Sequence, residues 1–296
     1  MLTGERERIL PRSTSRGIAF ADHGRGPALL AVHGGPGTDH GLFRPYLDPL
    51  AEDVRLVFFD LPGHGESSSM EDENLSSMSA SIDDVRTALE VETVALLGSS
   101  YGGFLALTYA LVHPGTVAAL VLVGTSPSHG FRDESIKVAE QRATPEMLKS
   151  LHRLWDGSLS SDAAFAWAWK DILPLYFHQL PPAEVDALAR RCSYTLETRR
   201  RILPTLQGYD LRDRLTEIEA PVLVITGRHD WITSLRQAEE LVAGLRHGEL
   251  VIFEDSGHYP FIEEQGRFLT VVREWLAIHL PDSARSRDKP ESVQEG

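Results

Sequence analysis

The chain has 296 residues, 42% of them hydrophobic and 24% charged, so it can bury a large core in a single domain that carries an insertion. Its 43 acidic residues outnumber its 29 basic ones, and the formal net charge of -14 argues against nucleic acid or an anionic membrane as a partner. Cys192 is the only cysteine, which excludes an internal disulfide and any metal site built on several cysteines.

The N-terminal residues predict no export signal. Residues 1–8 (MLTGERER) lack the apolar core of a secretory signal, and no apolar stretch approaches the length that spans a bilayer. We therefore expect a cytoplasmic protein with no membrane partner. A pair of short strands near 8–10 and 18–21 is expected to open the fold.

The first glycine-rich loop follows an apolar run at 28–32 (ALLAV), which is typical of a buried strand. The loop, HGGPG at 33–37, leaves backbone N–H groups unshielded, so the amide of Gly35 can face an oxygen that becomes negative. A plain turn is the alternative. No G-x-G-x-x-G opens a helix here, so we expect no nucleotide cofactor. His33 is expected to bond within its own loop rather than to react.

The next strand is expected at 54–59, and DLPGHGES follows it at 60–67. His64 lies in this turn, where it is expected to shape the side of a pocket. The twelve histidines include no H-x-H or H-E-x-x-H spacing. We therefore expect no metal.

The run GSSYGG at 98–103 lies between an apolar strand at 93–97 and a helix-like stretch at 104–110. In a tight turn of this kind the central serine occupies a strained apex, and small neighbours let the strand and helix approach each other. Ser100 is therefore the candidate nucleophile. The pentapeptide alone is a weak signal, and its place between strand and helix strengthens it.

After a strand at 118–124, the alternation of strands and helices stops. Residues 130–208 contain helix-like stretches broken by prolines and no long apolar strand, which predicts an inserted helical cap. The core would then comprise residues 1–129 and 209–282. The polar tail at 283–296 shows no periodicity and is expected to be disordered.

Six aromatic residues gather in the predicted cap: Trp155, Phe165, Trp167, Trp169, Tyr176 and Phe177. They could form the core of the cap or wall an apolar substrate pocket. Trp167 and Trp169 cannot share one helix face, so one of them is expected to face the site. These two tryptophans are the candidate substrate-binding residues.

Two further candidates follow later strands. PVLVI at 221–225 leads to Asp230, and LVIF at 250–253 leads to His258. The carboxyl ends of parallel strands share one edge, where ligand sites of open sheets lie. Imidazole can take a serine proton near neutrality, and a carboxylate fixes its tautomer. His258 is thus the candidate base and Asp230 the candidate orienting acid.

Other roles remain open for these carboxylates. Asp230 could cap a helix that begins near residue 234, and Asp255 is nearer to His258 in sequence. Asp230 is preferred because Asp255 shares the loop of His258 and reaches the far ring nitrogen only with difficulty. With the amide of Tyr101, which follows the nucleophile, the amide of Gly35 would complete an oxyanion hole.

In combination, HGGPG at 33–37 and GSSYGG at 98–103 resemble the proline iminopeptidase branch of the α/β-hydrolase superfamily, over about residues 15–280. The resemblance implies an α/β fold: a mostly parallel central sheet with helices on both faces and a helical cap. The turn at 60–67 is instead similar to that of many esterases and carbon-carbon bond hydrolases. Iminopeptidases bind the free amine of their substrate with cap carboxylates, whereas Glu184 and Glu197 are expected to be surface charges here.

These features predict a cofactor-independent serine hydrolase that works through an acyl-enzyme. Its substrate would be a small molecule or short peptide, with an N-terminal aminoacyl amide or ester as the first candidate. A carboxylic ester, a lactone or a carbon-carbon dione is the alternative. A member of the fold that binds a ligand without turning it over is the second alternative. The sequence leaves the oligomeric state open.

Overall fold

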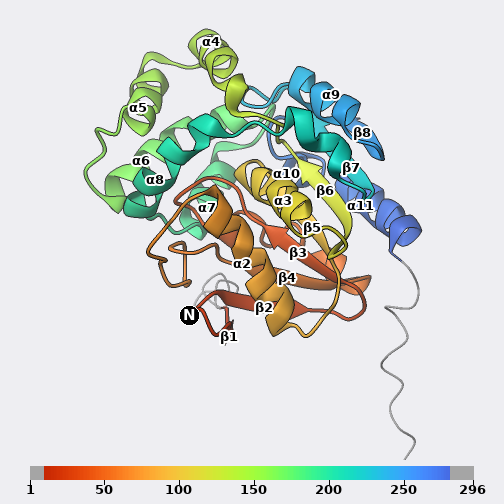
Figure 1. The fold of residues 1–296 in the computed structure, drawn as a ribbon. Coiled ribbons are helices and arrows are strands. Elements are labelled where there is room, and N and C mark those ends of the chain that lie inside the picture. The colour runs from red at the N-terminus through yellow and green to blue at the C-terminus, as the bar shows by residue number, and fades with distance from the viewer. Residues whose placement is uncertain (1–9, 281–296) are drawn as a thin grey trace, which may run out of the picture.

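The computed structural model describes residues 10–280, so the tail predicted at 283–296 lies outside the described residues. Its centre is an eight-stranded sheet in the order β1-β2-β4-β3-β5-β6-β7-β8 (Figure 1). The strands are β1 (Arg12–Ser13), β2 (Ala19–His23), β3 (Ala28–Val32), β4 (Arg55–Phe59), β5 (Val94–Ser99), β6 (Val117–Val123), β7 (Val222–Gly227) and β8 (Gly248–Phe253). β2 pairs antiparallel with both β1 and β4, and every other neighbouring pair is parallel. The predicted α/β class is confirmed.

The predicted strands from 18 onward are all present, whereas residues 8 and 9 of the strand predicted at 8–10 lie outside the described residues. The first strand of the described residues is Arg12–Ser13, and it pairs through Arg12 with Phe20 of β2. Both residues of this edge strand are exposed. An exposed two-residue strand carries no apolar alternation, so a hydrophobic pattern cannot locate it.

Helices cover both faces of the sheet. The helices are α2 (Leu75–Ala88), α3 (Tyr101–Val112), α4 (Arg132–Arg142), α5 (Pro145–Trp155), α6 (Asp162–Ile172), α7 (Pro182–Arg191), α8 (Leu196–Ile202), α9 (Leu235–Gly244), α10 (Pro260–Glu263) and α11 (Gln265–His279). In β3, Leu30 and Val32 pack with α2, α3 and α9, whereas Leu29 and Ala31 pack on the side of α11. A strand buried on both faces needs apolar residues at every position, which explains the unbroken runs in the sequence. Within residues 10–280, no helix combines the length and apolarity needed to cross a bilayer.

The described chain between β6 and β7 contains helices and no sheet strand, and α4 to α8 gather beyond one end of the sheet (Figure 1). These helices lie in the part of the chain where the sequence predicts a cap. The exact bounds of the cap, 130 and 208, stay a prediction. Hydrogen bonds join the segment to core loops: Thr195 N donates to Gly37 O at 2.8 Å, and Thr198 Oγ1 donates to Gly63 O at 2.7 Å.

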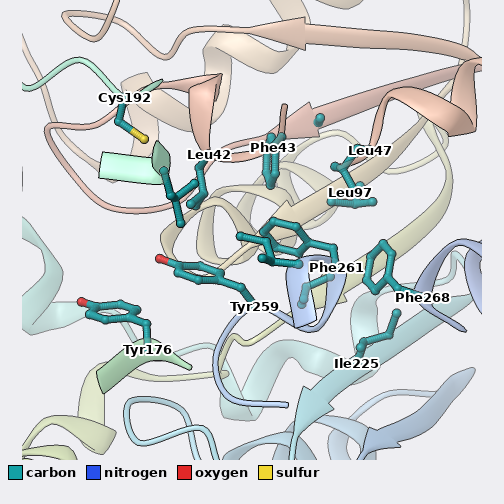
Figure 2. Packing of buried hydrophobic residues seen from close by; sticks show 14 of the residues in the cluster. Leu42, Phe43, Leu47, Leu97, Tyr176, Cys192, Ile225, Tyr259, Phe261 and Phe268 are labelled. Carbon is teal, nitrogen blue, oxygen red and sulfur yellow. The ribbon is translucent and has the colours of Figure 1, made fainter. Parts of the chain in front are cut away.

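Aromatic packing also attaches the helical segment to the core. Tyr176 stacks on Tyr259 with ring centroids 5.6 Å apart, and Phe261 packs against Phe43 and Phe268 at 5.6 and 5.8 Å (Figure 2). Of the six aromatics singled out in the sequence, four are buried in this same cluster: Phe165, Trp169, Tyr176 and Phe177. Most of them therefore pack as core.

Candidate active site

Ser100 occupies the turn between β5 and α3 with φ 54° and ψ -120°, in the left-handed region that non-glycine residues rarely adopt. Its N–H donates to Val123 O at 2.9 Å, and its carbonyl accepts from Thr125 Oγ1 at 2.9 Å. A β-carbon at Gly102 would overlap the carbonyl oxygen of Val32. The close approach of helix and strand thus requires glycine there, and these bonds hold the strained serine in place.

Asp230 and His258 are both buried and in direct contact. His258 Nδ1 lies 2.7 Å from Asp230 Oδ2. A carboxylate only accepts, so Nδ1 carries the proton and Nε2 is the basic nitrogen. The carboxylate also accepts from Ile232 N at 2.8 Å and from Thr233 Oγ1 at 2.8 Å, which fixes its orientation. Asp255 is exposed, and α9 begins after Ser234 rather than at Asp230.

Ser100 lines a cavity, and the ring of His258 packs against Tyr176 and Tyr259, which line the same cavity. His258 Nε2 is buried and has no hydrogen-bond partner among the described residues. Tyr259, the residue after His258, lines the cavity that Ser100 also lines. The structure therefore brings Asp230 to His258 and brings Ser100 to the adjoining cavity wall. Catalytic hydrogen bonds are often long before a substrate binds.

Gly124 lies close to His258 and leaves no room for a side chain of its own. A β-carbon at this residue, whose φ is +53°, would lie 3.0 Å from His258 Nδ1 and 2.9 Å from its carbonyl oxygen. We expect Gly124→Ala to displace the imidazole and to lower kcat/KM by roughly 10- to 100-fold, since catalysis is sensitive to displacements of about 1 Å. Ester hydrolysis by the purified variant measures this.

Gly115→Ala is the matched control. Gly115 has a φ of +87°, and no atom lies within 4 Å of a β-carbon there. The control therefore introduces comparable backbone strain away from the site, and it should lose stability while keeping its rate. Equal rates for the two variants would contradict the role given to Gly124.

The HGGPG loop lies against the serine turn. A β-carbon at Gly34 would be 3.1 Å from Ser100 Cβ. Gly35 and Tyr101 both line the cavity, and within residues 10–280 neither of their amides donates a hydrogen bond to a protein acceptor. Two unpaired N–H groups beside a serine hydroxyl are the arrangement that an oxyanion requires.

The cavity beside Ser100 has a volume of about 260 Å³ and is bounded by core loops and by the helical segment. Its walls are largely aromatic and include Trp155, Trp169, Tyr176 and Trp231. Trp167 is not brought to this cavity: it is 59% exposed and lines a separate depression on the outside of α6. Of the two tryptophans, only Trp169 lies where a substrate could contact it.

His33 and His64 are buried and structural. His33 Nε2 accepts from Leu61 N at 3.0 Å, so Nδ1 carries the proton and donates to Gly34 O at 3.0 Å, within the loop as expected. His64 Nδ1 donates to Pro62 O at 2.8 Å, and the two rings lie edge to face at 5.2 Å. Burial lowers the pKa of His33 to about 4 and that of His64 to about 3. Both are neutral at neutral pH.

These histidines should make the fold sensitive to acid. Between a pKa near 6.5 in the unfolded chain and the lower folded values, the unfolded state binds more protons, so stability falls as the pH falls. We expect each histidine to remove about 2–3 kcal/mol from the free energy of unfolding between about pH 7 and pH 4.5. Urea unfolding at both pH values measures the loss. In His64→Asn the new amide can still donate to Pro62 O, but it does not titrate. The loss in the free energy of unfolding between the two pH values should therefore be smaller by about 2–3 kcal/mol, and an unchanged loss would contradict the role of His64.

Two residues of the site were not anticipated from the sequence. Glu263 accepts from the N–H groups of His178, Gln179 and Gly257 at 2.6 to 2.8 Å, and so ties the helical segment to the loop of His258. No periodic signal marks it. Arg199 is buried at the cavity, and it did carry a signal: it occupies the helix face of Leu196 and Ile202, where an apolar residue is expected.

Within the described range 10–280, no cluster of three or more His, Cys, Asp or Glu side chains could hold a metal ion. Residues 27–265 match the family described as the alpha/beta hydrolase fold. The chain belongs to this family. The hydrolase therefore has the architecture that its glycine-rich motifs predicted.

Among its relatives, a proline iminopeptidase of Pestalotiopsis fici is 29% identical over 260 residues, covering 84% of the hydrolase and 92% of the relative. A pimeloyl-[acyl-carrier protein] methyl ester esterase of Nitrosomonas europaea is 29% identical over 259 residues, covering 83% and 94%. The solved proline iminopeptidase of Mycobacterium smegmatis superimposes with a TM-score of 0.71 at 21% identity, covering 90% and 98%, and shares the fold. The resemblance to proline iminopeptidases is confirmed, and an esterase reaches the same 29% identity.

Proposed function

We propose that this protein is a cofactor-independent serine hydrolase that works through an acyl-enzyme. Ser100 attacks a carbonyl carbon while His258 Nε2 takes its proton and passes it to the leaving group. Asp230 holds the imidazole, and the amides of Gly35 and Tyr101 stabilise the oxyanion. Water, activated by His258, then releases the acid. The observation that carries the proposal is the 2.7 Å contact of His258 Nδ1 with Asp230, which leaves Nε2 as the basic nitrogen. The ring of His258 packs against Tyr176 and Tyr259, which line the cavity together with Ser100.

For the substrate, the walls of the cavity favour a small carboxylic ester with an apolar portion that packs against Trp169 and Tyr176. No described residue that lines the cavity is Asp or Glu, and Glu184 and Glu197 are exposed. The free amine of an aminoacyl substrate would therefore meet no carboxylate. An N-terminal aminoacyl amide or ester is the second candidate, and the similarity to proline iminopeptidases favours it.

A fluorophosphonate probe and a substrate panel test this function. We expect the probe to label Ser100, and short nitrophenyl esters to be hydrolysed faster than prolyl or alanyl arylamides, with lactones in the panel as the remaining class. Faster turnover of the arylamides would establish the aminoacyl candidate instead. A folded protein that neither labels at Ser100 nor turns over any substrate would be a ligand-binding member of the fold and would contradict the proposal.

A further inference from the structure

Arg199 is a buried cation at the wall of the substrate cavity. It lies on α8, which Figure 1 shows among the helices beyond the end of the sheet. It is 6% exposed and lines the cavity together with Ser100. Its Nη1 donates to Pro36 O and its Nη2 to Leu154 O, both at 3.2 Å, and its guanidinium lies 5.1 Å from the ring centroid of Phe165. All of these partners are neutral. Nε has no partner among the described residues.

Nothing in the described chain neutralises this charge. Arg199 forms no ion pair with any residue of 10–280, and although burial lowers its pKa to about 10, it stays protonated at neutral pH. Acids on and around α8 have other partners, and the carboxylate of Asp162 accepts from Leu196 N at 2.7 Å. Glu197 and Glu73 both pair with Arg201, and the carboxylate of Asp156 accepts from Ser158 N. A buried cation without a counter-ion is costly, so a structural role alone accounts poorly for an arginine here.

The cavity as a whole has the opposite sign to the protein. The chain carries a formal net charge of -14, yet the cavity is lined by two arginines, Arg199 and Arg132, and by no described acid. Arg132 forms no ion pair with a described residue and faces the ring of Trp155 at 5.8 Å. This arrangement attracts an anion and disfavours an ammonium group.

We propose that Arg199 is a specificity-determining residue for a substrate that carries a carboxylate, and that this carboxylate supplies the missing counter-ion. The proposal rests on the serine hydrolase function and narrows its substrate class to carboxylate-bearing esters. A guanidinium has five N–H donors, of which two are held by carbonyl groups, so further donors remain for a carboxylate. The bond to Pro36 O places Arg199 next to Gly35 of the proposed oxyanion hole, within reach of a short substrate.

Matched ester pairs test this proposal. One pair compares 4-nitrophenyl butyrate with mono-4-nitrophenyl glutarate, and places the carboxylate on the acyl side. The other compares phenyl butyrate with 4-carboxyphenyl butyrate, and places it on the leaving group. We expect kcat/KM to favour the carboxylated member of at least one pair by about 10-fold or more, chiefly through KM. A neutral preference in both pairs would overturn the proposal.

Variants assign the preference to Arg199. Arg199→Gln should lower the selectivity ratio by roughly 10- to 100-fold, and Arg199→Lys should retain part of it, since the charge is kept. Arg200→Gln is the matched control, because Arg200 is exposed on the same helix and does not line the cavity. A ratio unchanged in both Arg199 variants would overturn the proposal. If Arg199→Gln does not fold, the selectivity ratios of Arg199→Lys and of the wild-type protein still test the proposal.

A binding measurement separates this proposal from the catalytic one. Titration of Ser100→Ala with monomethyl glutarate should quench the tryptophan fluorescence of the cavity, and the added Arg199→Gln change should weaken the affinity by a similar factor. Normal labelling of Ser100 with no carboxylate preference and no such binding would refute the role of Arg199 alone. Carboxylate binding without labelling or turnover would refute the hydrolase function alone.

Discussion

Replacement of Ser100 by alanine is expected to lower kcat for ester hydrolysis by about 10⁴-fold or more while the protein stays folded. The hydroxyl is the group that forms the covalent bond in the proposed mechanism. Of the two described non-glycine residues with a positive φ, Glu90 and Ser100, only Ser100 lines the cavity. The loss should appear in kcat rather than in KM, because substrate binding depends on the cavity walls. Steady-state kinetics and circular dichroism of the variant measure both quantities.

Ser99→Ala is the control for this experiment. Ser99 is the adjacent residue at the end of β5, is fully buried, and its hydroxyl has no hydrogen-bond partner in the described chain. Its removal should change the rate by no more than a few-fold. A Ser100→Ala variant that retains substantial activity, or a comparable loss in Ser99→Ala, would show that another group is the nucleophile.

Asp230→Asn is expected to lower kcat by roughly 10³- to 10⁴-fold with little change in stability. The asparagine oxygen can still accept from Ile232 N and Thr233 N, so the turn is preserved. Its amide group would then face His258 Nδ1 and favour the tautomer that carries the proton on Nε2. A protonated Nε2 cannot take the serine proton, so the loss should be relieved as the pH is raised and hydroxide can replace the base.

Asp255→Asn tests the alternative acid. Asp255 precedes His258 by three residues but is exposed, whereas Asp230 contacts the ring at 2.7 Å. The Asp255 variant should keep its rate within a few-fold. A larger loss in Asp255→Asn than in Asp230→Asn would reverse the assignment of the orienting acid.

Much of this site was predictable because each candidate follows an apolar strand. Unbroken runs such as ALLAV and PVLVI predict strands buried on both faces, and the ends of parallel strands meet at one edge of a sheet. The order of the strands therefore predicts that Ser100, Asp230 and His258 lie at the same edge of the sheet. Their contact distances do not, because they depend on loop conformations such as the turn at Gly124.

The helical segment was predictable only in outline. Its apolar faces identify helices, but the choice between Trp167 and Trp169 depends on how α6 rotates against α5 and α7, which is a tertiary effect. Arg199 was missed because it belongs to a run of arginines at 199–201 that resembles a solvated helix face. Only its register with Leu196 and Ile202 distinguishes it. The hydrogen bond from His258 N to Tyr176 O, 2.7 Å long, likewise joins segments far apart in the sequence.

Trapping of the acyl-enzyme tests the central claim most directly. Rapid acid quenching during turnover of a 4-nitrophenyl ester, followed by mass spectrometry of the digested protein, should find the acyl mass on the peptide that contains Ser100. The burst of nitrophenol should match the enzyme concentration. An actively hydrolysing protein in which Ser100 stays unmodified while another residue carries the acyl group, or in which no acyl group forms, would contradict the account.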